Sequence, residues 1–183
     1  MKILGINASP RPDSNVKAAL EIVLDEAKSN GADGEIVNVN SLTISACQAD
    51  GYCKEHDGEC ALNDDMQDIY KKIEDSDIIL FGSPIYFCDI TAQAKTVIDR
   101  LYSYFMNETY GKLFADKKVH IIASHGAAPV EMFIGSLNTQ MNVFGGLGFQ
   151  TGEIITLEGN NVPGAVKGKE DQIEQLKALA ASL

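Results

Sequence analysis

The sequence predicts an α/β fold, a doubly wound five-stranded parallel sheet with helices on both faces. Short segments rich in Ile and Val alternate along the chain with segments whose apolar residues recur at helical spacing. Such alternation requires crossover connections, which make the strands parallel and put helices on both faces of the sheet. Because no linker or internal repeat divides the 183 residues, a single domain over residues 1–183 is expected.

Five apolar segments are the expected strands. Polar residues hardly interrupt them, as expected for strands that are covered on both faces. In chain order they comprise residues 2–6, 35–38, 77–82, 119–124 and 152–157.

Amphipathic segments fill the intervals between these strands. A helix over residues 66–73 follows Asp64 and Asp65, whose negative charge suits a helix N-terminus. Four further helices are indicated by apolar residues three and four positions apart, which share one helix face. These positions are Val16, Ala19, Leu20, Val23, Leu24 and Ala27; Ala94, Val97, Ile98, Leu101 and Phe105; Phe133, Leu137, Met141 and Phe144; and Ile173, Leu176, Ala180 and Leu183.

The loop after the first strand is the first candidate binding segment, because ligands of such sheets bind beyond the carboxyl ends of the strands. Ser9, Ser14 and Asn15 lie where the first helix exposes unpaired N–H groups, and Arg11 adds a planar cation suited to phosphate. A simple helix cap explains the same residues equally well. Neither the dinucleotide fingerprint nor the P-loop motif is present, which favours a mononucleotide over a dinucleotide.

The loop after the third strand is the second candidate segment. Pro84, Ile85, Tyr86 and Phe87 follow the strand directly, and a helix is expected to begin near Ala92. Aromatic side chains at a strand's carboxyl end can form a wall for a flat heterocycle. The alternative is that Tyr86 and Phe87 are core residues at a bend.

Two motifs carry a resemblance to a known family. SPRPDSN at residues 9–15 precedes an amphipathic helix, and GSPIYF at residues 82–87 is followed by AQAKTVIDR at residues 92–100. The chain thereby resembles the NADPH-dependent FMN reductase and iron-sulfur flavoprotein group of the flavodoxin-like superfamily, most closely over residues 2–20 and 44–105. The resemblance implies a flavodoxin-like fold, bound FMN as cofactor and NAD(P)H as electron donor.

The resemblance also implies which residues bind the cofactor. One group would hold the FMN phosphate, a second would line the isoalloxazine ring, and a third would close the other side of the ring, where His125 is a candidate cation. In this order the groups are Ser9, Arg11, Ser14, Asn15 and Val16; Pro84, Ile85, Tyr86 and Phe87; and Ser124, His125 and Gly126.

The cysteines lie mainly in one segment, residues 47–60. Iron-sulfur flavoproteins have four cysteines in such a run, but here Asp50 stands at the second position, between Cys47 and the pair Cys53 and Cys60. Four thiolates are the normal ligands of a cubane cluster, so unligated thiols and no bound metal are expected. Aspartate ligation of a cluster and a three-thiolate zinc site remain alternatives. Cys88 is expected to be a small packing residue.

The charge of the chain excludes several partners. With 15 basic and 26 acidic side chains the net charge is −11, which argues against nucleic acid and against anionic membrane surfaces. No run of about 18 apolar residues exists, and the first apolar run is too short for a signal peptide. The expected compartment is the cytoplasm, where the cysteines stay reduced.

These observations favour an FMN-binding oxidoreductase that takes hydride from NAD(P)H and passes electrons to a small acceptor such as a quinone, free flavin or metal ion. No catalytic nucleophile is expected, because hydride passes directly between nicotinamide and flavin. The alternatives are an electron carrier with a protein partner and a redox or metal-sensing module around the cysteines. A homodimer or homotetramer is expected, with residues 47–60 or the aromatic-rich residues 102–112 near the interface.

Overall fold

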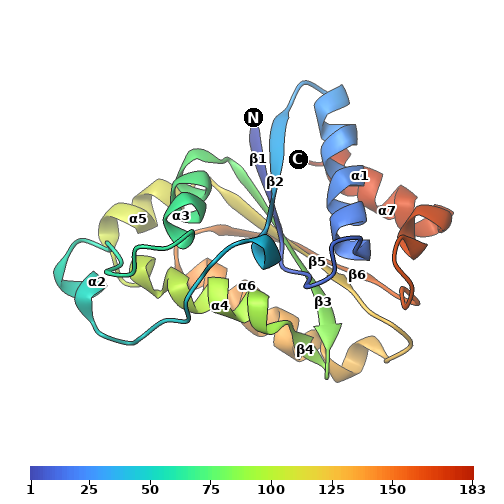
Figure 1. Cartoon of the computed structure of the whole chain (residues 1–183). Coiled ribbons are helices and arrows are strands. Elements are labelled where there is room, and N and C mark those ends of the chain that lie inside the picture. Colours follow the sequence, from blue (N-terminus) through green and yellow to red (C-terminus); the bar gives the residue numbers. More distant parts are fainter.

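A twisted sheet runs through the middle of the computed structural model, which describes residues 1–183, and helices cover both faces of the sheet (Figure 1). Its parallel strands have the order β2-β1-β3-β5-β6. This flavodoxin-like order reverses direction beside β1, so a crevice opens between the ends of β1 and β3. The strands are β1 (Lys2–Asn7), β2 (Asp33–Asn38), β3 (Ile78–Tyr86), β5 (Lys118–Ser124) and β6 (Gln150–Leu157).

The helices form two layers, as Figure 1 shows. α1 (Asn15–Ser29) and α7 (Glu170–Ala181) cover one face of the sheet and share an apolar core with it. The other face is covered by α3 (Met66–Asp75), α4 (Ala92–Arg100), α5 (Glu108–Phe114) and α6 (Ile134–Gly146). The short elements are α2 (Tyr52–Glu55), η1 (Val39–Ser41), η2 (Leu101–Tyr104), η3 (Val130–Met132) and η4 (Ala165–Gly168).

A sixth strand corrects the prediction of five. β4 (Asp89–Ile90) pairs antiparallel with the end of β3, through Ile85 with Ile90 and Tyr86 with Asp89. Two residues are too short for any periodic pattern. The turn that joins the strands also lacks the glycine or asparagine expected there, since Phe87 (φ 50°) and Cys88 (φ 63°) both adopt left-handed conformations. The sequence therefore carries no signal for this hairpin.

Several element boundaries also differ from the sequence prediction. α4 ends at Arg100 and the chain continues as a short 3-10 helix, so Leu101 and Phe105 lie beyond the α-helix. The short helices α2 and α5 had no periodic signal. None of the helices combines the length and the apolar character that crossing a membrane requires.

Candidate functional site

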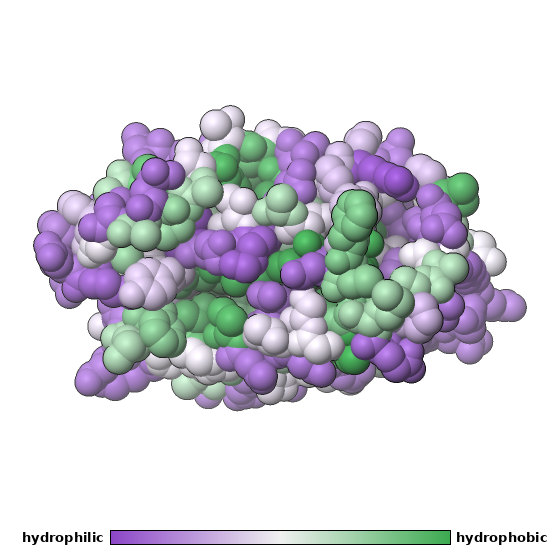
Figure 2. Space-filling model, turned by 90° about the horizontal axis from the view of Figure 1, so that it is seen from below, coloured by the Kyte–Doolittle hydropathy of each residue, from purple (hydrophilic) through white to green (hydrophobic).

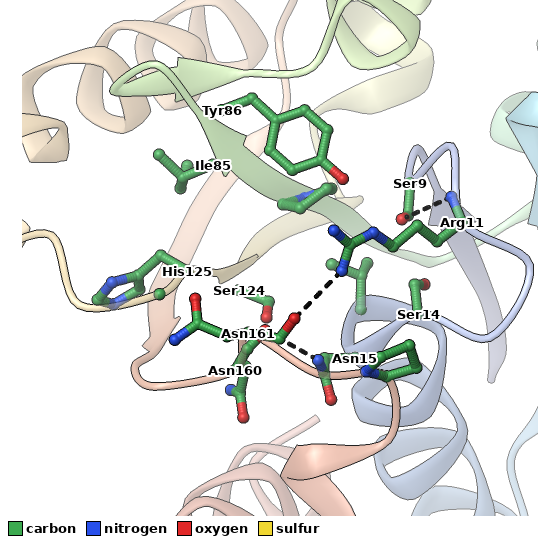
Figure 3. Close-up of a pocket in the computed structure, with 14 residues that line it drawn as sticks. Ser9, Arg11, Ser14, Asn15, Ile85, Tyr86, Ser124, His125, Asn160 and Asn161 are labelled. Atoms are coloured by element: carbon green, nitrogen blue, oxygen red, sulfur yellow. Dashed lines mark hydrogen bonds between the residues drawn. The ribbon is translucent and has the colours of Figure 1, made fainter.

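A cavity of about 210 Å³ lies at the crevice between the carboxyl ends of β1, β3 and β5 (Figure 3). It brings together four loops that are far apart in the sequence. Every residue proposed from the sequence to bind the cofactor lines this cavity, except Phe87. Three further residues from the loop after β6 line it as well: Asn160, Asn161 and Pro163.

The first loop is organised by Asn7, the last residue of β1, which is buried. Its Oδ1 accepts hydrogen bonds from the Ser9 amide (3.2 Å) and from Ser14 Oγ (3.4 Å). Its Nδ2 donates to Asn38 Oδ1 at 2.9 Å, which ties the loop to β2. Ser14 also caps α1, because its Oγ accepts a bond from the Lys17 amide at 3.0 Å. The helix cap and the loop expected to bind an anion are therefore the same structure.

The N-terminus of α1 points its free N–H groups at the cavity. The first amides with intrahelical partners are those of Lys17 and Ala18, which bond to Ser14, so the amides of Asn15 and Val16 remain available. The Val16 side chain is buried against Gly82, where a Cβ would approach Val16 Cγ1 to 2.5 Å. Val16 thus offers the cavity only its backbone, and Gly82 allows the close approach of the helix to β3.

Arg11 reaches across the cavity from the first loop. Its Nη1 donates to the backbone oxygen of Asn161 at 3.3 Å, and the guanidinium lies over the opening in Figure 3. A planar cation beside a helix N-terminus is a suitable arrangement for a phosphate group.

The β3–β4 hairpin forms the second wall. Pro84 and Ile85 line the cavity, and the Tyr86 ring stands over it while remaining 39% exposed (Figure 3). Phe87 is fully exposed at the tip of the turn and does not reach the cavity. Because both aromatic side chains are exposed, the alternative that they belong to the core is wrong.

Ser124, His125 and Gly126 form the third wall, at the end of β5. His125 is buried, packs edge-on against Phe133, and neither ring nitrogen has a hydrogen-bond partner. Burial lowers the pKa of His125, against the smaller opposing effect of Glu158. Burial therefore favours the neutral imidazole, and it argues against the alternative of a cation at this position.

Sequence reasoning missed Asn7 and the loop after β6. Asn7 was placed in the loop after the first strand and given no role, and only its contacts with Ser9 and Ser14 reveal one. Asn160, Asn161 and Pro163 also follow a strand's carboxyl end, so the rule that directed attention to the other loops applied here too.

A family model described as NADPH-dependent FMN reductase matches residues 1–154. The chain belongs to the NADPH-dependent FMN reductase family. The predicted family is thereby confirmed, and the predicted cofactor FMN and the predicted electron donor NAD(P)H fit the family description, which names FMN and NADPH.

Individual relatives of this FMN reductase family member agree with that assignment. An iron-sulfur flavoprotein of Archaeoglobus fulgidus is 32% identical over 145 residues, covering 79% of this chain and 64% of the relative. An iron-sulfur flavoprotein of Methanosarcina thermophila is 35% identical over 100 residues, covering 55% of this chain and 52% of the relative. The match thus spans between about half and two thirds of the relatives' length.

A solved structure shows the same fold. The FMN-dependent NADH-azoreductase from Bacillus anthracis, in complex with FMN, superposes with a TM-score of 0.75 at 16% identity, over 100% of this chain and 99% of that protein. The expected flavodoxin-like architecture of this family member is therefore confirmed, apart from the additional strand β4.

The names of the two relatives raise the question whether residues 47–60 fit an iron-sulfur cluster. The segment offers three thiols, of Cys47, Cys53 and Cys60, and Asp50 at the fourth position. Asp50 is exposed, and its Oδ1 accepts a bond from the Tyr52 amide at 3.0 Å, at the start of α2. This donor set does not match the four thiolates of a cubane cluster. Burial raises the pKa of the Cys53 thiol, and Lys54 opposes this in part.

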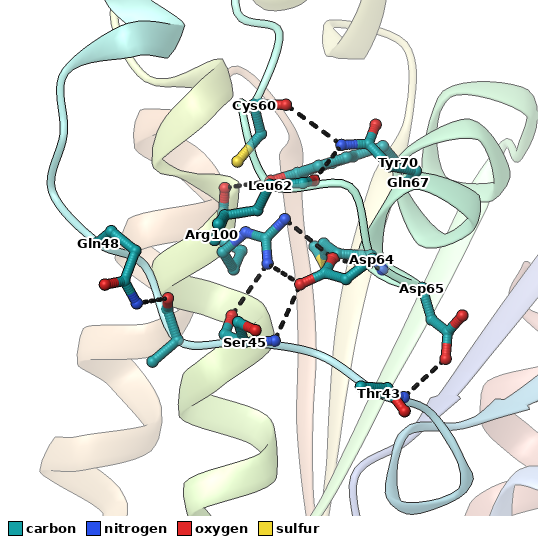
Figure 4. Close-up of polar contacts among 12 residues, drawn as sticks. Thr43, Ser45, Gln48, Cys60, Leu62, Asp64, Asp65, Gln67, Tyr70 and Arg100 are labelled. Atoms are coloured by element: carbon teal, nitrogen blue, oxygen red, sulfur yellow. Dashed lines mark hydrogen bonds and ion pairs between the residues drawn. The ribbon is translucent and has the colours of Figure 1, made fainter.

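An ion pair fixes the cysteine segment to the rest of this family member (Figure 4). The buried Arg100 guanidinium donates to both carboxylate oxygens of Asp64, at 2.7 and 3.1 Å, and to the Ser45 backbone oxygen at 2.9 Å. Burial acts to raise the pKa of Asp64, but the hydrogen bonds from Arg100, Ser45 and Met66 outweigh it, so the pKa is lowered. The Asp64 carboxylate, just before α3, thus connects Ser45, which precedes the cysteines, with Arg100 at the end of α4.

Proposed function

We propose that this chain binds one FMN in the cavity and uses it for NAD(P)H-dependent reduction of a small acceptor, such as a quinone, free flavin or metal ion. The observation that carries the proposal is the convergence of an anion pocket and an aromatic wall at the sheet's switch point. Bound FMN would supply the capacity to accept hydride and to pass electrons on. The chain's own residues would bind it, orient it and leave one face accessible.

The phosphate would lie at the N-terminus of α1. The free amides of Asn15 and Val16 and the hydroxyl of Ser9 are hydrogen-bond donors there, whereas the Ser14 hydroxyl would have to exchange its bond with Asn7 Oδ1 for one to the phosphate. Arg11 would exchange its bond with the Asn161 backbone for charge-assisted bonds to the phosphate. The partial positive charge of the helix terminus adds to this attraction.

The ring would lie between the β3–β4 hairpin and the loop after β5. Pro84, Ile85 and Tyr86 supply the wall on one side, and Ser124, His125 and Gly126 the wall on the other. A cavity of about 210 Å³ is smaller than the roughly 300–1,000 Å³ typical of small-molecule sites. The cavity would therefore enclose part of the FMN and leave the rest accessible to nicotinamide and acceptor, with Phe87 at the rim.

The test begins with the ligand. Flavin released by heat from the purified or reconstituted protein should have the mass of FMN, and release of FAD or of no flavin contradicts the proposal. Arg11→Ala should weaken FMN binding on the order of 10- to 100-fold, since a hydrogen bond to a charged group contributes about 1.5–3 kcal/mol. Lys112→Ala removes an exposed cation on α5 and serves as the control.

A second candidate function is electron transfer to a protein partner. It is favoured by the name iron-sulfur flavoprotein of both relatives and by the net charge of −11, which suits docking on a basic surface. Steady-state oxidation of NADPH with an added soluble quinone separates the two functions. Multiple turnovers support the reductase, and their absence with FMN bound supports the carrier.

We further propose that the protein is cytoplasmic, has no nucleic-acid or membrane partner, and forms a homodimer or homotetramer. Figure 2 shows apolar side chains gathered in several places on the face seen from below. An apolar groove of about 620 Å³ runs between α4–η2 and α6. Beside it Tyr102, Phe105 and Met106 are 48%, 40% and 87% exposed, as aromatic and Met side chains at interfaces tend to be before assembly.

A further inference from the structure

The loop between β6 and η4 forms one wall of the cavity although it lies outside the matched family region. The family match ends at residue 154, whereas Asn160, Asn161 and Pro163 line the cavity. Nothing in the family assignment therefore accounts for these residues. The backbone of this loop and the Asn160 side chain are fixed by hydrogen bonds, whereas the Asn161 side chain makes none.

Asn15 holds this loop from the start of α1. Its Nδ2 donates to the backbone oxygens of Asn160 (3.1 Å) and Val162 (2.8 Å). Its Oδ1 accepts a bond from the Val166 amide at 3.1 Å. The side chain is buried, and both amide hydrogens and its oxygen are used by the loop. The Asn15 side chain is thus committed to the loop, while its backbone amide stays free for the anion pocket.

The loop is held at its other side by the third wall of the cavity. The Gly159 amide donates to the Gly126 oxygen at 3.0 Å, and the Asn160 amide donates to the His125 oxygen at 2.9 Å. Asn160 Nδ2 donates to Leu157 O at 3.0 Å and to Gln172 Oε1 at 2.9 Å. The backbone on both sides of Asn161 is therefore fixed.

The Asn161 side chain is free by comparison. It is exposed, and its carboxamide makes no hydrogen bond within the chain; only the backbone oxygen of Asn161 is bonded, to Arg11. It lies against Gly126, where a Cβ would come within 2.3 Å of Asn161 Oδ1, and Figure 3 shows it between Ser124 and His125. A carboxamide that lines a cavity, can both donate and accept, and is held only through its backbone is suited to a ligand.

We propose that the Asn161 carboxamide hydrogen-bonds a polar group of the bound FMN, and that Asn15 is a positioning residue that holds Asn161 in place. This inference rests on the proposed function. It assigns a binding role to a residue beyond the family match and gives the Asn15 side chain a role through the loop instead of through the phosphate.

Asn161→Ala tests the contact. Loss of one neutral hydrogen bond should raise the FMN dissociation constant about 3- to 10-fold, measured by titration of flavin fluorescence. Asn63→Ala is the control, because Asn63 is an exposed asparagine outside this cavity and outside the groove between α4–η2 and α6. An unchanged dissociation constant in Asn161→Ala overturns the assignment of Asn161.

Asn15→Ala tests the positioning role. It should weaken FMN binding by no more than Asn161→Ala does, about 3- to 10-fold. The double variant should bind no more weakly than Asn161→Ala alone, because Asn15 acts through Asn161. Additive losses overturn the positioning role. Asn15→Asp keeps an oxygen acceptor for the Val166 amide and should retain part of the hydrogen-exchange protection of that amide.

Hydrogen exchange without flavin separates this inference from the proposed function. The Val166 amide should exchange faster in Asn15→Ala than in the wild type, whatever the ligand is. Unchanged exchange overturns the role of Asn15 in holding the loop. A wild-type protein that binds no FMN overturns the proposed function and the role of Asn161, while faster exchange in Asn15→Ala still supports the positioning of the loop.

Discussion

In single residues at the site, the backbone and the side chain have different contacts. Val16 presents an amide to the cavity while its side chain packs on Gly82, and Asn15 presents an amide while its side chain holds the loop after β6. The motif that predicted both as phosphate ligands identified the start of α1, where their backbone amides lie, and their binding of phosphate stays a prediction. Motifs of this kind identify where a helix begins, and they do not specify what each side chain contacts.

The lowered pKa of buried His120 leads us to expect a smaller free energy of unfolding in mild acid. Burial, assisted by the charge of Lys118, lowers its pKa from 6.5 to about 4, and its Nδ1 accepts a bond from the Glu153 amide at 3.0 Å. As the pH falls, the unfolded chain takes up the proton near pH 6.5 and the folded chain only near 4. The contribution of neutral His120 to the free energy of unfolding is therefore fully present above pH 6.5 and is lost toward pH 4. The loss between pH 7 and 5 is about 2 kcal/mol.

Urea unfolding at these two pH values measures the effect. His120→Gln should lose about 2 kcal/mol less than the wild type between pH 7 and 5. His56→Gln, at an exposed position, is the matched control. Equal losses in the wild type and in His120→Gln would show that another group titrates.

Because Asp50 stands where a fourth cysteine would be needed, we expect the isolated protein to carry no intact four-iron cluster. The segment supplies three thiols where a cubane takes four, and the Asp50 carboxylate bonds to the Tyr52 amide. Anaerobic reconstitution with iron and sulfide should leave iron near zero while FMN stays bound. About four irons and four sulfides per chain would overturn the prediction, and Asp50→Cys should then stabilise the cluster further.

At the scale of elements, the sequence predicted what local patterns encode. The five parallel strands and the helices on both faces follow from periodicity, and the structure confirms them. Hairpin strand β4 could not be predicted, because two residues have no period and Phe87 and Cys88 adopt conformations that favour glycine. The loop after β6 follows a strand's carboxyl end as the other loops do, but the contacts that hold it at the site join it to Asn15, 145 residues away, and leave no pattern in the sequence.

The ion pair of Asp64 and Arg100 should be the most sensitive link between elements. Asp64→Ala leaves a buried guanidinium unpaired, which typically costs about 3–5 kcal/mol. The midpoint of urea unfolding should fall accordingly. Removing both charges, in Asp64→Ala with Arg100→Leu, should recover much of the loss, because the unpaired charge is gone. A loss under about 1 kcal/mol in the single variant would show that water reaches the guanidinium.

At the scale of the whole molecule, the exposed aromatic surface predicts assembly. Light scattering at micromolar concentration should report a multiple of the 19.8 kDa chain. Phe105→Glu places a charge beside the groove between α4–η2 and α6 and should shift the population toward single chains, with the circular dichroism spectrum unchanged. A wild-type protein that is entirely 19.8 kDa contradicts the expected dimer or tetramer.

The contacts of Asn15 also set an order of events during synthesis. Residue 15 leaves the ribosome early, yet its side chain finds its partners only when residues 160–166 have followed. A nascent chain that has reached residue 154 can build β1, α1 and the anion pocket, but it lacks one wall of the cavity. Cofactor loading would then wait until residues 160–166 have been made, and a chain that stops before them would be recognised by its failure to retain flavin.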